Sequence, residues 1–164
     1  MNKLLKFTDL ASKLGAGLSS VLMLLIVMLI FLEIILRTFF NTSTFIADEY
    51  SGYFFVGLVM MGLSYTFKEN GHIRITILTT RIPKKASFIL EILSLFIVTA
   101  VLVFLIYHSA FMIYDGYILD MRADTVAETK LFIPQIFLIL GFVLFFIQVA
   151  VTTYIKLKGD SVDK

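Results

Sequence analysis

Four long apolar stretches dominate this sequence, and they leave few folds open to it. Each stretch is long enough to cross the hydrocarbon core of a bilayer, which takes about 20 helical residues. Inside that core the backbone must satisfy its own hydrogen bonds within the segment, so the stretches predict helices. We expect four transmembrane helices at roughly residues 15–36, 50–67, 86–113 and 131–155.

The composition supports lipid as the surrounding medium. Of the 164 residues, 59% are hydrophobic and 16% are charged, whereas soluble domains carry roughly a quarter charged residues. A chain of this size cannot bury so much apolar surface in its own core. No repeat, linker or low-complexity tract divides residues 1–164. We therefore predict a single all-α integral membrane domain.

The basic residues are distributed unevenly among the segments that join the predicted spans. Of the 14 Lys and Arg residues, all but Arg37, Arg122 and Lys130 fall in the N-terminal segment, the connection between the second and third spans, or the C-terminal tail. Cytoplasmic segments of membrane proteins carry the excess of Lys and Arg. Both termini are therefore expected in the cytoplasm.

Residues 1–14 have a pattern of their own. On a helical wheel Leu4, Phe7, Leu10 and Leu14 share one face, and Lys6, Asp9, Ser12 and Lys13 share the other. An amphipathic helix with a basic face binds the surface of a membrane that contains anionic lipids. The segment predicts an interfacial amphipathic helix in contact with membrane lipids. A disordered leader is the alternative.

Four charged residues at the ends of the first two spans are the main candidates for a functional role. Glu33 precedes Arg37 by four residues, which is the favourable order for an ion pair on one helix face. The pair fits either of two roles, locking a partner helix or anchoring the span at the interface. Asp48 and Glu49 begin the second span, where the helix dipole favours negative charge, and could contact Arg37. A shared metal ion is not expected, because adjacent helical residues point about 100° apart.

The second span and its exit supply the remaining candidates. Gly57 and Gly62 lack side chains where a neighbouring helix could approach. Gly71 is placed to end that helix. His72 fits a capping group at the helix end better than a titrating switch, and Arg74 belongs to an alternating polar and apolar segment typical of the interface.

Several functional classes are excluded by what the sequence lacks. It has no cysteine, which excludes disulfides and thiolate metal sites. Its two histidines, His72 and His108, are predicted on opposite sides of the membrane and cannot hold one haem. The sequence offers no nucleophile–base cluster, phosphate-binding glycine loop or metal-ligand spacing. We expect no enzyme activity, no cofactor, no metal and no nucleic-acid partner.

One stretch of the chain resembles a known family. The matching residues are Arg37, Asp48, Glu49, Gly62, the run Asn70-Gly71-His72-Ile73-Arg74-Ile75, and Pro83. In these and in its length the chain resembles the small membrane subunit, of DctQ type, of tripartite ATP-independent periplasmic (TRAP) transporters. It departs from that family's pattern at Gln135 and Leu140, where tryptophan and proline are frequent, and it has no tryptophan.

The resemblance implies a three-part importer in the cell inner membrane. A periplasmic solute-binding protein would bind transiently, and a large membrane subunit would carry the substrate and sodium sites. This chain would be the small scaffold subunit, and the substrate an organic acid such as a dicarboxylate or a sialic acid. The alternatives are a stand-alone four-helix channel or small transporter, which should show a polar stripe through its spans, and a redox membrane anchor.

Overall fold

The computed structural model of the protein describes residues 2–69 and 83–158, and this part of the chain is built from helices without a strand. The helices are α1 (Asn2–Phe40), α2 (Ala47–Lys68), α4 (Lys84–Ile118) and α5 (Phe132–Leu157). The all-helical fold predicted from the sequence is therefore confirmed. The predicted candidates Gly71, His72 and Arg74 lie outside the described residues.

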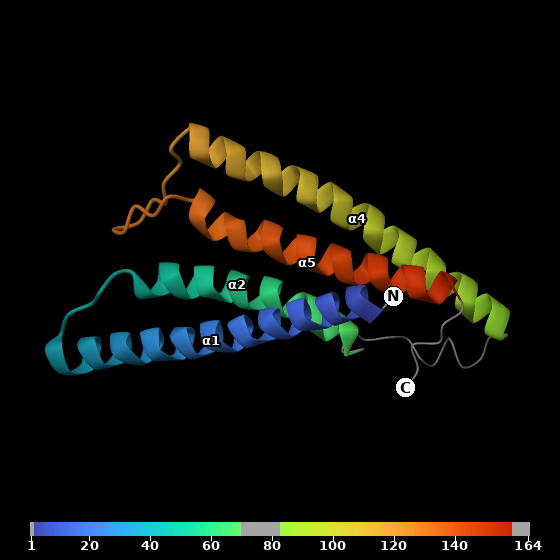
Figure 1. Ribbon diagram of the computed structural model, residues 1–164. Coiled ribbons are helices and arrows are strands. Elements are labelled where there is room, and N and C mark those ends of the chain that lie inside the picture. Colours follow the sequence, from blue (N-terminus) through green and yellow to red (C-terminus); the bar gives the residue numbers. More distant parts are fainter. Residues whose placement is uncertain (1, 70–82, 159–164) are drawn as a thin grey trace.

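The four helices lie side by side in the order α1, α2, α5, α4 (Figure 1). α1 and α2 form one antiparallel pair, α4 and α5 form another, and α2 packs against α5 to join them. The turn between α1 and α2 lies at the same end of the molecule as the loop between α4 and α5. Each of the two outer helices therefore has one flank that no other described helix covers.

The surface of these flanks is apolar. On α1 the exposed residues include Leu24, Met28 and Phe31, and on α4 they include Phe96, Val103 and Phe104. Three helical segments are long and apolar enough to cross a membrane: Lys6–Phe40, Ala86–Ile118 and Phe132–Leu157. α2 does not meet that criterion, so the fourth crossing and the cytoplasmic location of both termini stay predictions.

α2 lies between α1 and α5, and a glycine on each of these two helices allows it to approach α2 closely. A Cβ atom on Gly15 would lie 2.5 Å from the backbone oxygen of Met61, and one on Gly141 would lie 2.7 Å from that of Met60. These distances are below van der Waals contact, so only glycine allows the two helices to approach α2 this closely. Consecutive methionines of α2 thus face two different neighbours.

Gly57 and Gly62, predicted to lie where a neighbour approaches, both face α1. A Cβ atom on Gly57 would lie 2.9 Å from Leu22, and one on Gly62 would lie 3.1 Å from the hydroxyl of Ser19. Ser19 also donates a 2.6 Å hydrogen bond to the backbone oxygen of Leu58. The contact between α1 and α2 therefore combines missing side chains with a polar bond, as membrane helix contacts often do.

A small apolar core joins α4 and α5. It consists of Leu95, Leu102 and Val149, with partly buried aromatic residues around it. One of these contacts is the edge-to-face pair of Phe67 and Phe145, whose ring centroids lie 5.3 Å apart. Because Phe67 belongs to α2, the core extends across the contact between the two helix pairs.

The N-terminal segment differs from the expected separate helix. Residues 2–14 continue into the first span without a break, as part of α1. Ser12, expected on the face toward headgroups, is buried against α2 and α5, while Lys6 and Lys13 are exposed. The polar face of the segment therefore packs on the protein, whereas Phe7, Leu10 and Leu14 of its apolar face are exposed, so contact with membrane lipids stays a prediction.

Candidate functional site

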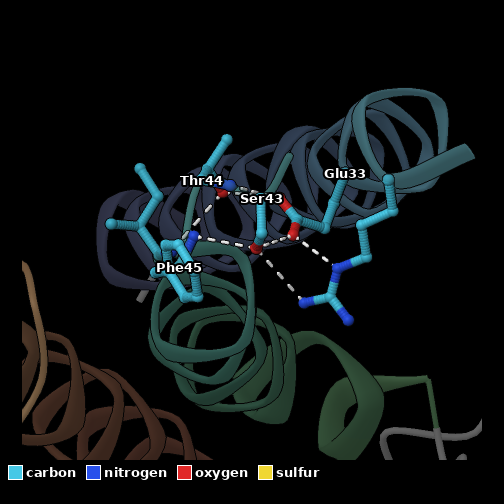
Figure 2. Close-up of polar contacts among 6 residues, drawn as sticks. Glu33, Ser43, Thr44 and Phe45 are labelled. Atoms are coloured by element: carbon cyan, nitrogen blue, oxygen red, sulfur yellow. Dashed lines mark hydrogen bonds and ion pairs between the residues drawn. The ribbon is translucent and has the colours of Figure 1, made fainter. Parts of the chain in front are cut away.

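Glu33 is the centre of a polar cluster at the turn between α1 and α2. It lies in α1, yet its side chain accepts hydrogen bonds from the turn, residues 41–46, that follows the helix. The hydroxyl and backbone N–H of Thr44 donate to Glu33 Oε2 at 2.6 and 3.1 Å, and the hydroxyl of Ser43 donates to Oε1. Figure 2 shows the carboxylate enclosed by these two residues. Glu33 is only 6% exposed, so the turn covers it.

Arg37 completes the cluster from one helical turn further along α1. Its Nε lies 2.7 Å from Glu33 Oε1, and its Nη2 lies 3.4 Å from the hydroxyl of Ser43. The structure thus brings together the two residues that the four-residue spacing paired. The Arg37 side chain is 57% exposed while the Glu33 side chain is buried. Hydrogen bonds to an ionised carboxylate are stronger than those between neutral groups, whereas an ion pair with an exposed partner contributes less. The hydrogen bonds from Ser43 and Thr44 to Glu33 therefore stabilise the turn more than the pair with Arg37 does.

The local sequence explains why the chain can turn here. Asn41 and Phe45 have left-handed backbone conformations, with φ of 49° and 58°. The side chains of Ser43 and Thr44 accept hydrogen bonds from the backbone N–H groups of Phe45 and Ile46, at 3.1 and 3.4 Å. Such short side-chain bonds to the backbone two residues on are typical of serine and threonine turns. The same two hydroxyl groups therefore shape the turn and bind Glu33.

The expected contact between Arg37 and the acidic start of α2 is not formed. Arg37 pairs with Glu33, and within the described residues no ion pair joins it to Asp48 or Glu49. Glu49 accepts hydrogen bonds from the hydroxyl of Tyr53 at 2.8 Å and from that of Thr125. The hydrogen bond from Thr125 lowers the pKa of Glu49 below its ordinary value. The physical reason is that Glu33 lies one helical turn before Arg37 on the same face of α1, so its carboxylate is within hydrogen-bond distance of the guanidinium.

Glu49 instead links α2 to the loop between α4 and α5. Thr125 belongs to that loop, and a second contact joins Thr129 to the hydroxyl of Tyr50 at 3.4 Å. Within the loop, Asp120 accepts hydrogen bonds from Lys130 and from Arg122, each at 3.0 Å. The hydrogen bond from Lys130 and, to a lesser extent, that from Arg122 lower the pKa of Asp120. The two helix pairs are therefore joined at this end by polar contacts.

A second polar cluster lies near the other end of the molecule and was not predicted. The hydroxyl of Ser12 lies 2.9 Å from that of Ser64 and 3.3 Å from Gln148 Oε1. All three residues are buried, and they come from α1, α2 and α5. The signal in the sequence was Gln148, a polar residue in a largely apolar span. Polar residues in such spans usually meet another polar group across a helix contact.

Two ion pairs flank this second cluster. Lys68 at the end of α2 pairs with Asp9 of α1, and Lys156 near the end of α5 pairs with Glu91 of α4. Asp9 also lies 2.9 Å from Lys13. The first ion pair joins α1 to α2 and the second joins α4 to α5. Each antiparallel helix pair therefore has an ion pair at the end where α1 begins.

The clusters have the chemistry of structural contacts. Both oxygens of the Glu33 carboxylate are occupied by donors from the chain itself, which leaves its charge balanced by Arg37. In residues 2–69 and 83–158 no group of three or more His, Cys, Asp or Glu side chains is arranged to hold a metal ion. Among the predicted residues, Glu33, Arg37 and Glu49 bind a turn or loop, and Gly57 and Gly62 are close helix contacts. Asp48 is exposed at the start of α2.

Comparison with known proteins gives consistent results. Residues 26–159 match the profile of the family described as tripartite ATP-independent periplasmic transporters, DctQ component. One relative in Haemophilus influenzae, named as a TRAP transporter small permease protein, is 35% identical over 66 residues, which are 40% of this chain and 41% of that protein. A second H. influenzae protein of the same name is 24% identical over 134 residues, which cover 82% of this chain and 79% of the relative. The first match spans about two fifths of the relative's length, and the second spans most of both proteins.

Proposed function

This chain belongs to the DctQ component family of tripartite ATP-independent periplasmic transporters, and from that premise we propose that it is the scaffold subunit of a sodium-coupled importer of an organic acid. It is a multi-pass protein of the inner membrane, and its family is one of transporter subunits, not of enzymes. The proposal concerns what the subunit contributes: a rigid body beside a larger membrane subunit that moves the substrate.

The observation that carries the scaffold role is the way in which the chain uses its polar groups. Glu33 is bound by its own turn, and the buried Ser12, Ser64 and Gln148 bind one another. A transport site needs polar groups that converge on a solute, often where helices are interrupted at mid-depth. Here α1, α4 and α5 each run uninterrupted, and their polar residues fasten helix to helix.

The partners follow from the family and from the surface. A large membrane subunit would form the stable complex, because α1 and α4 each present an apolar flank longer than a bilayer crossing needs. A periplasmic solute-binding protein would bind transiently and deliver the substrate. The sodium and substrate sites would belong to the large subunit. A dicarboxylate, a sialic acid or a similar organic acid fits this class of importer.

Four membrane crossings with both termini in the cytoplasm remain part of the proposal. α2 has 22 residues, enough to cross a bilayer, and it lies between two longer apolar helices. A helix in that position does not need a strongly apolar surface, since α1 and α5 cover much of it. Labelling of single cysteines from either side of the membrane would check this topology, because the chain has no cysteine of its own.

The test of function is deletion of this subunit in cells that depend on the importer. Deletion should abolish uptake of the organic acid, and expression of the full chain should restore it. The chain should also co-purify with a larger membrane protein. Normal uptake by the deletion strain would refute the proposal. Solute flux through liposomes that contain this chain alone would instead favour a stand-alone channel or small transporter.

A further inference from the structure

In and beside the α1–α2 turn, the hydroxyl groups of Ser43 and Thr44 point inward and three aromatic side chains are exposed, with Asn41 and Thr42 also exposed. Ser43 and Thr44 direct their hydroxyl groups onto Glu33, which is buried. Three phenylalanines around the turn are instead exposed: Phe39 by 75%, Phe40 by 68% and Phe45 by 68%. In water, apolar side chains are driven inward and polar ones remain outside. The turn therefore has the arrangement expected of a surface that meets an apolar medium.

The backbone holds one of these phenylalanines outward at a conformational cost. Phe45 has a φ of 58°, in the left-handed region that bulky residues rarely adopt. Its N–H donates a 3.1 Å hydrogen bond to the hydroxyl of Ser43, which itself binds Glu33. In Figure 2 the ring of Phe45 lies apart from the Glu33 carboxylate. The hydrogen bonds of the turn thus fix an exposed aromatic ring in place.

The second connection at this end of the molecule provides a contrast. In the loop between α4 and α5, Asp120, Arg122 and Lys130 are exposed and paired with one another, as in a loop that faces water. Its exposed apolar side chains are Leu119, Met121 and Val126, and Val126 stands among charged neighbours. The contrast with the turn therefore lies in these paired charges. Both connections lie at the same end of the protein (Figure 1), so their different chemistry indicates different surroundings.

We propose that the α1–α2 turn is a phospholipid-binding surface, with Phe39, Phe40 and Phe45 among the upper acyl chains and Arg37 at the level of the phosphates. The exposed apolar flank of α1, including Phe31 and Ile34, leads directly into the three phenylalanines and continues the lipid-facing surface of the helix. The inference needs only that α1 lies in a membrane, so it stands apart from the transport proposal.

Arg37 supplies the charge that this surface needs. Its side chain is 57% exposed beside a hollow lined by Asn41, Thr42, Ser43 and Phe45. Long basic side chains near helix ends extend their charged groups toward the headgroups while their stems stay among apolar groups. A lipid phosphate in that hollow would lie beside both Arg37 and Phe45. The turn would then hold the end of α1 at a fixed depth.

Single tryptophans test this placement, because the chain has none of its own. Phe40→Trp and Phe45→Trp place the probe on the turn, and Val126→Trp places a control on the other loop. The full chain is reconstituted into phosphatidylcholine vesicles with or without bromine on the upper acyl carbons. The two turn probes should lose most of their emission in brominated vesicles and resist aqueous acrylamide. The control should show the reverse, and two turn variants guard against a substitution that misfolds.

The same measurement separates lipid from a protein partner. It is repeated on the complex with the large subunit, after subtraction of the emission from a complex that contains the tryptophan-free chain. Persistent quenching by brominated lipid supports the proposal. Quenching by acrylamide in vesicles would overturn it, because the turn would then face water. Loss of lipid quenching on assembly would also overturn it, because the turn would then be a contact between proteins.

Discussion

Gly15 and Gly17 lie two residues apart in α1 and offer a matched test of how closely α1 approaches α2. A Cβ atom on Gly15 would lie 2.5 Å from the backbone oxygen of Met61, whereas one on Gly17 would meet nothing within 4 Å. Gly15→Ala therefore introduces a clash. Gly17→Ala makes the same chemical change on open surface and serves as its control.

The size of the effect follows from this geometry. Ordinary contact begins at 3.4 Å, so the helices must separate at Gly15 by about 0.9 Å, the difference from 2.5 Å. The clashing atom belongs to the backbone of α2 and cannot rotate away. Overpacking of this kind costs ~1–3 kcal/mol. Alanine stabilises a helix relative to glycine by about 1 kcal/mol at both sites, and this gain cancels in the comparison.

We therefore expect Gly15→Ala to be less stable than Gly17→Ala by about 1–3 kcal/mol. The free energy of unfolding can be measured on the full chain by titrating mixed micelles with dodecyl sulfate and following helix content by circular dichroism. Gly17→Ala should equal or exceed the parent chain. Equal stability of the two variants would refute the close approach of α1 to Met61.

Four further predictions concern polar contacts. Glu33→Ala should lower the free energy of unfolding by about 2–4 kcal/mol, because it leaves the donors of the turn without an acceptor. Arg37→Ala should lower it by less than Glu33→Ala does, because Ser43 and Thr44 still donate to the carboxylate; a larger loss for Arg37→Ala would contradict this order. A double-mutant cycle of Ser12→Ala and Gln148→Met should give a coupling energy of roughly 0.6 kcal/mol, typical of hydrogen bonds between membrane helices, and additive effects would exclude the bond. The lowered pKa of Asp120 stabilises the α4–α5 loop above the ordinary value of 3.8, and this stability is lost as the pH falls through the lower pKa of the folded state. The protection of the loop amides from hydrogen exchange, relative to the intrinsic exchange rate at each pH, should therefore fall in acid, and Asp120→Asn should remove that pH dependence.

The helices themselves were largely predictable. The spans expected at 86–113 and 131–155 correspond to α4 (Lys84–Ile118) and α5 (Phe132–Leu157), and the one at 50–67 corresponds to α2 (Ala47–Lys68). A long apolar run has one way to satisfy its backbone hydrogen bonds in lipid, so its local composition is sufficient. The exception is the start of α1, which continues the first span without a break and packs its polar face on α2 and α5, while its apolar face stays exposed.

The candidate site was predictable only where its partners lie on one helix. The spacing of Glu33 and Arg37 indicated their pairing, because residues four apart on a helix are neighbours. Nothing in the sequence indicated that Ser43 and Thr44 would fold back onto Glu33, since this depends on the left-handed conformations of the turn. The acidic start of α2 was expected to bind Arg37, yet Glu49 contacts a loop 76 residues away.

The amino-acid sequence was enough to predict a helical membrane protein, because both properties follow from the length and apolarity of single segments. Tertiary structure alone decided which helices are neighbours and which polar groups meet. Ser12 and Gln148 are 136 residues apart, and only the packing of α5 against α1 and α2 brings them within 3.3 Å. Lipid favours every apolar surface alike, so the choice of neighbour rests on close contacts at glycine and on hydrogen bonds between helices.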